Sequence, residues 1–431
     1  MRKRIEILVL IISLLGTVTG CGKEALPNTY IPGSDYQYTM FSPTLSLEKI
    51  QHVEGGVYLV NGQYIYYLDE STDTITPLCN KVDCLHERET DEVKKKECNA
   101  YIVNKPINNH IQYYNGYIYY LDRGFPSVEA SSIYRISEDG SKKEMVYQWS
   151  NNELFIDKWA LHRGVVYYTS YVLKMAENTA TGEQEMKQLY TISGLPVDGL
   201  TKKPITILNQ EDDLVGYDVI GFGFPRAYGN YVYFYVWAYE ETTDEITSEN
   251  VYDYEYYKEY VYDVLNDECR IVEIENQKKT EVIQLGTFWK DKAIYYLYDF
   301  EKELLEPSNI YMADLDGTNV ELFLEDIPQG YNVMTDGHYL YLSNDYKVSI
   351  GTIDEEKTYW IYNQDLELID TYHLPYEIFG DRPMGTPECQ YILIPDEEGL
   401  GFKVLRWDKE NVGNYQGSNI EVTEIVYSIA E

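Results

Sequence analysis

The sequence predicts an all-β fold, a β-propeller of four-stranded antiparallel blades. Three observations support it. Paired strand–turn–strand segments repeat along the chain, the repeats start roughly 46 to 66 residues apart, and no segment carries the i, i+3, i+4 apolar pattern of a packed helix. A repeat of that length with four strands in each unit is typical of propeller blades.

The first element of each unit is a strand, a tight turn and a second strand. Pairs such as Asn-Gly, Arg-Gly and Asp-Gly separate the apolar alternations, and these residues tolerate the positive φ of two-residue hairpin turns. The seven copies occupy residues 57–69, 111–122, 159–170, 225–237, 286–299, 332–343 and 389–396.

The second element follows most of the first ones as another apolar hairpin, often with Asp-Gly at its turn. Its copies occupy residues 133–147, 189–207, 269–283, 310–324 and 359–372. Two hairpins make one blade, so we expect seven blades, with six or eight as alternatives. One blade could be split between the termini, with a strand near Ile420 closing the ring. Residues 80–109, 173–187 and 239–262 are interpreted as insertions in loops, where function usually lies.

Tyrosine is unusually abundant, with 46 residues spread over every unit. Its ring covers a pleated surface and its hydroxyl reaches water, which suits strands. In YIYYLD, alternation places Tyr117 and Tyr119 on one face and Ile118 and Tyr120 on the other. Blades pack face to face, so both faces should be largely buried. We therefore interpret most tyrosines as structural, and a minority near the channel mouth could form a binding platform.

The N-terminus is typical of an exported chain. Basic MRKR precedes a short apolar run, and small residues precede Cys21. Residues 1–20 are interpreted as a signal peptide. Val18-Thr19-Gly20-Cys21 resembles the lipobox of bacterial lipoproteins, which implies a lipidated Cys21. Residues 21–44 hold three prolines and no helical period, so we expect a flexible tether there, followed by a single propeller domain at 45–431.

The chain is strongly acidic, with 72 Asp and Glu against 35 Lys and Arg and a net charge of −37. Such a body is repelled by nucleic acid and by anionic lipid, so we expect no nucleic-acid partner. Screening limits this repulsion to about 8 Å, and two acyl chains suffice for stable anchoring. We therefore expect a cell-membrane location facing the extracellular side, with an acidic surface that is mainly solvated.

The alternation of NGYIYYLD-like and IYRISEDGS-like segments behind a lipobox resembles the tyrosine-rich lipoproteins of Gram-positive anaerobes. Their domain of unknown function looks like the YWTD propeller of lipoprotein receptors. The resemblance implies a propeller fold and assigns no chemistry. Here YYLD, at residues 66–69 and 119–122, replaces the YWTD tetrapeptide.

One cluster has possible chemistry: Cys79, Cys84, His86 and Cys98 fall within twenty residues. Three thiolates and an imidazole could hold a structural zinc ion. The alternative is a disulfide from Cys79 or Cys84 to Cys98, which suits an exported chain and would contribute about 3 kcal/mol. Similar Cys-x4-Cys-x-His segments occur in the lipoproteins that the chain resembles. Either role is structural, because four protein ligands leave no open position for substrate.

No HExxH, GxSxG, P-loop or dinucleotide-binding glycine motif occurs in the sequence, and the six histidines are scattered. His162 and His338 fall in or beside hairpin turns, where we expect solvated structural roles. The leading hypothesis is a non-enzymatic surface propeller that binds an extracellular ligand or an envelope protein. The alternative is an extracellular polysaccharide hydrolase or lyase, with carboxylates converging in the channel and at least one of them strongly perturbed.

Overall fold

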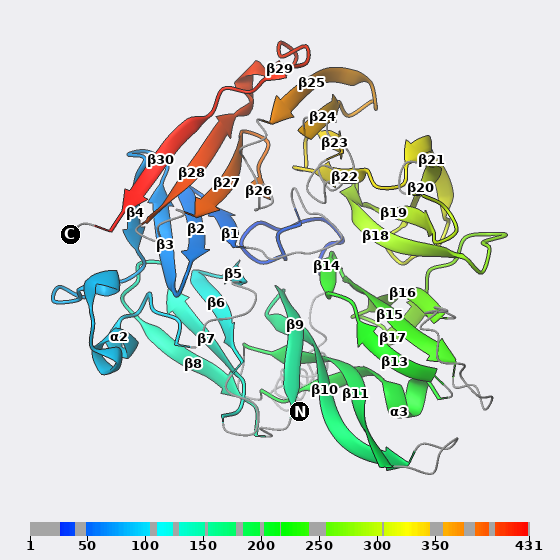
Figure 1. Cartoon of the computed structure of the whole chain (residues 1–431), viewed down its shortest axis with the longest axis horizontal. Helices are drawn as coiled ribbons and strands as arrows, with labels where there is room; N and C mark the ends of the chain where they lie inside the picture. The colour runs from blue at the N-terminus through cyan, green and yellow to red at the C-terminus, as the bar shows by residue number, and fades with distance from the viewer. Residues whose placement is uncertain are drawn as a thin grey trace, which may run out of the picture.

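Seven antiparallel sheets stand in a ring around a common axis in this computed structural model (Figure 1), so the predicted seven-bladed β-propeller is confirmed. We number the blades along the chain. The structure describes residues 26–38, 49–103, 110–123, 129–150, 154–177, 184–198, 202–215, 217–240, 256–303, 306–344, 357–374, 384–395 and 401–429. In that part of the chain, no helix is long and apolar enough to cross a membrane.

Blades 1 to 3 are each built from four consecutive strands. Blade 1 holds β1 (Ile50–Val53), β2 (Gly56–Asn61), β3 (Tyr64–Asp69) and β4 (Thr74–Pro77). Blade 2 holds β5 (Ile111–Tyr114), β6 (Tyr117–Asp122), β7 (Ser132–Ser137) and β8 (Lys143–Gln148). Blade 3 holds β9 (Phe155–His162), β10 (Val165–Glu177), β11 (Gln184–Pro196) and β12 (Ile205–Asn209).

Blades 4 and 5 follow the same plan, except that the inner edge of blade 4 is divided. Blade 4 holds β13 (Tyr217–Phe222) and β14 (Arg226–Tyr228), both paired with β15 (Tyr231–Glu240), then β16 (Tyr256–Asp263) and β17 (Glu268–Ile271). Blade 5 holds β18 (Glu281–Trp289), β19 (Lys292–Asp299), β20 (Pro307–Asp314) and β21 (Glu321–Pro328).

In blades 6 and 7, one short strand that lies within the sequence of blade 7 pairs with the outer edge of blade 6. Blade 6 holds β22 (Asn332–Thr335), β23 (Leu340–Ser343), β24 (Lys357–Tyr362), β25 (Leu368–Leu374) and the parallel β29 (Ser418–Asn419). Blade 7 holds β26 (Met384–Gly385), β27 (Cys389–Pro395), β28 (Gly401–Asp408) and β30 (Thr423–Ser428). The short helices are η1 (His86–Arg88), α2 (Glu92–Glu97), α3 (Gln210–Asp213) and η2 (Lys409–Asn411).

Within a blade we call the strands A to D, from the axis outward. In an antiparallel sheet, the A–B and C–D turns lie at one end of the strands and the B–C turns and D–A connections at the other. The ring therefore has an A–B face and a B–C face. Its apolar cores lie between neighbouring blades: one joins blades 3, 4 and 5, and another joins blades 7, 1 and 2.

Tyrosine fills these cores as expected. Tyr119 and Tyr120 of β6 point to opposite faces, and their exposed fractions are 0% and 1%. Both faces of this strand are buried because each packs against a neighbouring blade. The tyrosine-rich strands thus build the sheets and their contacts.

Three expectations about the elements are wrong. Residues 57–69 form the B–C hairpin of blade 1, because β1 precedes them, whereas residues 111–122 form the A–B hairpin of blade 2. Residues 269–283 do not form one hairpin, since β17 ends blade 4 and β18 begins blade 5. Parts of the expected loop insertions 173–187 and 239–262 are strand extensions of β10, β11, β15 and β16.

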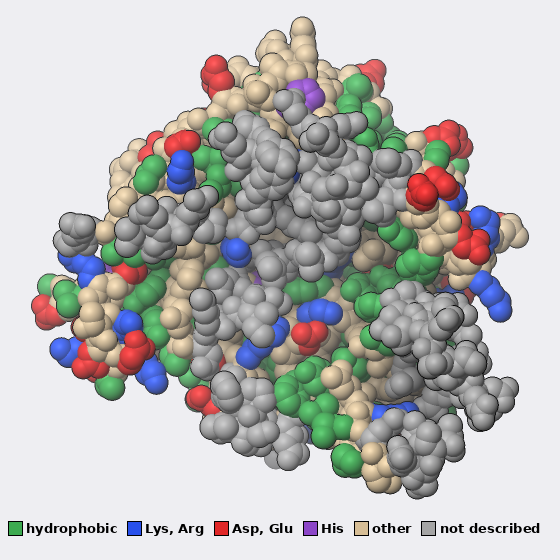
Figure 2. Space-filling view, in the orientation of Figure 1, with side chains coloured by type: hydrophobic (Ala, Val, Ile, Leu, Met, Phe, Trp, Pro, Cys, Tyr) green, Lys and Arg blue, Asp and Glu red, His purple; other side chains and the backbone are tan. Residues whose placement is uncertain are grey.

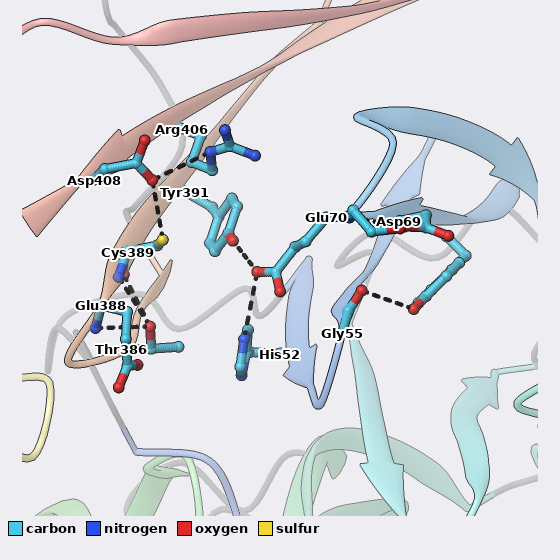
Figure 3. A network of polar contacts seen from close by, with 12 residues as sticks. His52, Gly55, Asp69, Glu70, Thr386, Glu388, Cys389, Tyr391, Arg406 and Asp408 are labelled. Carbon is cyan, nitrogen blue, oxygen red and sulfur yellow. Dashed lines mark hydrogen bonds and ion pairs between the residues drawn. The ribbon is translucent and has the colours of Figure 1, made fainter.

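Among the described residues, no strand is shared between the two ends of the ring. β30 pairs with β28 inside blade 7, and β1 pairs with β2, so the alternative of a split blade is wrong. Side chains join blades 7 and 1 instead, on the A–B face (Figure 3). Tyr391 donates a hydrogen bond to Glu70, which lies 3.6 Å from the imidazole of His52. Arg406 contacts Asp73 at 2.5 Å.

Residues 26–38, which we call the N-terminal clasp, lie against the A–B turns. Asn115 of blade 2 and Arg163 of blade 3 donate backbone hydrogen bonds of 2.9 Å to carbonyls of the clasp. Tyr36 and Tyr38 are buried, and the ring of Tyr38 contacts Phe288 of blade 5 edge-on. The expected flexible tether is therefore wrong for residues 26–38, because tyrosines and hydrogen bonds fix the clasp to the ring. The rest of 21–44 lies outside the described residues.

Candidate metal centre

The candidate metal ligands lie in the insertion that follows blade 1. β4 ends at Pro77, and Cys79 lies two residues further along the chain. Cys84 closes a turn in which its amide donates to the Lys81 carbonyl at 3.2 Å. His86 begins η1, and Cys98 is the residue directly after α2. Two short helical turns thus return the chain to Cys79.

Local capping explains why the chain folds back. The Asp91 carboxylate accepts hydrogen bonds from the amides of Val93 and Lys94, which are otherwise unpaired donors at the start of α2. His86 adopts a φ of +52°, which is uncommon for a residue with a side chain. Its carbonyl accepts a hydrogen bond of 3.0 Å from the Tyr64 hydroxyl, so blade 1 holds this conformation.

The four predicted residues meet at one point. One ligand atom from each of Cys79, Cys84, His86 and Cys98 lies within 4.8 Å of the other three. Cys98 Sγ is 3.6 Å from His86 Nδ1. Cys98 is buried, while the other three are half-buried. The cluster is therefore compact and sealed on its inner side.

These distances fit a tetrahedral ion. With Zn–S bonds of about 2.3 Å and Zn–N bonds of about 2.0 Å, neighbouring ligand atoms lie roughly 3.5–3.8 Å apart. The thiol–imidazole distance already matches, and the remaining atoms need to approach by about 1 Å at most. Soft thiolates with an imidazole suit zinc better than the hard cations that oxygen ligands select. The cluster could hold a metal ion.

Electrostatics inside the cluster depend on its close thiols. Hydrogen bonds from Cys98, and then from His86, lower the pKa of the Cys79 thiol to about 3. The same contact with Cys79 raises the pKa of Cys98, and burial raises that of Cys84. One thiolate is thus already favoured where a cation would be bound.

Blade 2 supports the cluster through the turn that joins β7 and β8. The Gly140 carbonyl accepts hydrogen bonds from the Asn80 amide at 3.4 Å and from the Asn99 side chain at 2.8 Å. Gly140 has a φ of +69°, and a Cβ atom there would lie 2.8 Å from the Cys79 nitrogen. Only glycine fits this close approach.

The insertion also contacts the last strand of the ring. Glu87 accepts a hydrogen bond of 2.8 Å from the Tyr427 hydroxyl of β30. In Figure 2, the projection on the left, labelled α2 in Figure 1, carries both basic and acidic side chains. The centre therefore lies at the outer rim, beside the junction of blades 7, 1 and 2, far from the ring axis.

The other predicted residues do not join this cluster. Cys21 lies outside the described residues, and Cys389 donates to Asp408 at 3.2 Å in blade 7. His338 is exposed, as expected. His162 is not solvated: it is 1% exposed, its Nδ1 accepts from the Tyr36 amide at 3.0 Å, and its Nε2 lies 2.8 Å from the Gly229 carbonyl. Burial lowers the pKa of His162 to about 4.

One carboxyl group among the described residues has a raised pKa. Burial raises the pKa of Glu259, on β16, to about 7. The side chain is 2% exposed, and the Leu285 amide donates to it at 3.3 Å across the boundary of blades 4 and 5. The charge of the buried Arg226 opposes this rise in the pKa of Glu259. Glu259 thus links blades 4 and 5 in the interior.

The charged contacts of the clasp were not anticipated. Arg163 Nε donates to Asp35 Oδ1 at 2.8 Å, and both side chains are nearly inaccessible to water. The sequence did carry a signal for a docked segment, namely the apolar residues Tyr30, Ile31, Tyr36 and Tyr38. The segment was interpreted as a tether because of its prolines.

Comparisons with known proteins give distant likenesses only. No protein-family model matches the chain, and no curated protein matches it. An oligogalacturonate lyase in complex with manganese is 11% identical, with a TM-score of 0.47, and the match covers 92% of this chain and 91% of the lyase. Porphyromonas gingivalis dipeptidyl peptidase 4 is 10% identical, with a TM-score of 0.43, and the match covers 89% of this chain and 54% of that one.

A third solved structure, a Synechocystis apocarotenoid oxygenase mutant, is 11% identical, with a TM-score of 0.36, and the match covers 73% and 68% of the two chains. The ligands and substrates of these proteins are properties of those proteins and are not assigned to this chain. The sheets and the cluster of this chain define a seven-bladed β-propeller with a thiol–imidazole centre that could hold a metal ion.

Proposed function

We propose that this chain is a cell-surface lipoprotein, anchored at Cys21, whose propeller binds an extracellular ligand or an envelope protein without catalysis. The insertion after blade 1 holds a structural zinc ion at Cys79, Cys84, His86 and Cys98. The lipobox-like residues before Cys21 and the acidic body support an exported, membrane-tethered protein that does not bind nucleic acid.

The observation that carries the proposal is the four-residue ligand set at the rim. A zinc ion with four protein ligands has no open position for water or substrate, so it stabilises a fold and does not catalyse. The cluster also joins three blades, through Gly140 of blade 2 and through Tyr427 of blade 7. A bound ion would therefore stabilise the ring at its seam.

A polysaccharide hydrolase or lyase needs a perturbed carboxyl group that substrate can reach. Glu259 is perturbed, but it is enclosed between blades. The binding role is therefore the better supported of the two. Turnover of a polysaccharide by the purified protein, abolished by E259Q without loss of folding, would reverse this order.

Metal analysis tests the centre directly. We expect a secreted form that starts after Cys21 to carry about one zinc per chain, with three of its five cysteines protected from thiol reagents. C98S should lose the metal, whereas the matched control C269S should keep it. A metal-free protein with a disulfide among Cys79, Cys84 and Cys98 would contradict the zinc centre.

Acylation is tested separately in cells. Labelled fatty acid should be incorporated into the full chain and not into C21S, and C21S should move from the membrane fraction to the medium. Equal partition of both forms would contradict the anchor while leaving the zinc centre standing.

A further inference from the structure

We propose that the A–B face of the ring is its membrane-proximal face, and that the B–C face points away from the bilayer. The inference rests on the proposed anchor at Cys21 and deepens it, because it assigns the two faces of the propeller. It depends on how the clasp, residues 26–38, is held.

The clasp is fixed to the A–B turns of several blades. The amide of Asn115, in the A–B turn of blade 2, donates to the Gly33 carbonyl at 2.9 Å. Asn230, in that of blade 4, donates from its side chain to the Leu26 carbonyl at 3.0 Å. On blade 1, the Gln37 side chain donates to the His52 carbonyl at 2.6 Å. The segment thus spans the axis on one face.

A buried charge pair secures its middle. Arg163, in the A–B turn of blade 3, contacts both carboxylate oxygens of Asp35, and its Nη2 donates to the carbonyls of Pro27 and Thr29 at 2.8 and 3.1 Å. Side-chain exposure is 9% for Arg163 and 1% for Asp35. Releasing the clasp would break these hydrogen bonds together, and hydrogen bonds between charged groups are stronger than those between neutral ones. The clasp is therefore held firmly to the A–B face of the ring.

Chain length then decides which face can approach the bilayer. Five residue steps separate Cys21 from Leu26, and they span at most about 18 Å. The nine residues of β18 alone rise about 30 Å along the blade. An acylated Cys21 therefore cannot bring the B–C face to the membrane while Leu26 stays bonded to Asn230 on the A–B face.

Charge sets how closely that face approaches. Its turns carry acidic side chains, among them Glu138, Asp139, Asp291 and Asp365, in blades 2, 5 and 6. Anionic headgroups repel them within about 8 Å at physiological salt. The maximum reach of five residue steps, about 18 Å, exceeds that distance, so the face can stand off from the bilayer and remain oriented toward it.

The B–C face is the end of the molecule that lies farther from the proposed anchor. The hairpin of β10 and β11 ends there and extends past the body of blade 3. Met175 and Met186 are directly paired across this hairpin, with 61% and 63% of each side chain exposed.

Four exposed native lysines can be used to measure how accessible each face is, so no residue has to be substituted for the experiment. Lys142 and Lys290 lie in a C–D and an A–B turn, on the predicted proximal face, whereas Lys278 and Lys403 lie at the opposite end of the strands. The acylated chain is bound to phosphatidylcholine vesicles. It is then treated with an amine-reactive ester of a long polyethylene glycol, which is too bulky to enter the space between the A–B face and the bilayer. The rate at each lysine is divided by its rate in C21S free in solution.

We expect this ratio to fall several-fold at Lys142 and Lys290 and to stay near unity at Lys278 and Lys403. R163M should reduce the contrast by releasing the clasp. Equal ratios at all four lysines on vesicle-bound chain would overturn the orientation alone. An acylated chain that fails to float with vesicles would overturn the anchor, and the orientation with it.

Discussion

At the scale of single residues, buried polar groups fix the conformation where chain segments far apart meet. His162 is the best example, because its neutral imidazole receives the Tyr36 amide on one nitrogen and faces the Gly229 carbonyl with the other. Protonation would place a donor opposite the Tyr36 donor. The histidine therefore makes the attachment of the clasp sensitive to acid.

We predict that His162 makes the folded protein less stable as the pH falls from about 6.5 to 4. Its folded-state pKa of about 4 lies below the unfolded value, so the unfolded chain binds the proton more readily in this window. The full effect is roughly 3 kcal/mol of unfolding free energy. Urea unfolding of the wild type and H162N across this range measures it, and identical pH profiles would contradict it.

Residue-level prediction succeeded where the chemistry was local. Cys79, Cys84, His86 and Cys98 are close in sequence, so their spacing alone indicated a shared site. The role of His162 could not be anticipated, since its partners lie 126 and 67 residues away. A position beside a turn indicates that the side chain is exposed, and His162 is buried only because the clasp packs against it.

At the scale of elements, hairpin signals located strands well and assigned them to blades less well. Asn-Gly marks a tight turn in both blades, where the two loop residues are 62–63 in blade 1 and 115–116 in blade 2, yet the first is a B–C turn and the second an A–B turn. Turn chemistry fixes local register only. Which strand begins a blade depends on packing between blades, and the hairpin pattern of the sequence holds no information about that packing.

The turn at Gly140 gives a prediction with a matched control. Gly62 and Gly140 both have positive φ, but a Cβ at Gly62 meets nothing within 4 Å, whereas one at Gly140 meets the backbone of Leu78 and Cys79. G62A should cost about 1–2 kcal/mol of unfolding free energy. G140A should cost more and also weaken zinc binding roughly 10–100-fold.

Competition with a chelator measures the zinc affinity of both variants, and urea unfolding measures their stability. Equal zinc affinity in G62A and G140A would show that the turn of blade 2 does not position the Cys79 ligand.

At the scale of the whole molecule, the ring is held at its seam by side chains and across its axis by the clasp. A form that starts at residue 39 should lose about 3 kcal/mol or more relative to one that starts at residue 22, because the hydrogen bonds of Arg163 to the clasp and the burial of Tyr36 and Tyr38 are lost. Hydrogen exchange should accelerate at the amides of Asn115 and Arg163, whose acceptors are removed. Unchanged exchange at both amides would contradict the role of the clasp.

The clasp also determines how the molecule responds to mechanical force. With the proposed lipid anchor, a pull on the N-terminus would reach the described part of the chain at Leu26 and would be shared among hydrogen bonds to several blades. Had the first strand closed the ring, the same pull would peel it away one bond at a time. The architecture therefore resists tearing at the point where an anchored protein is pulled.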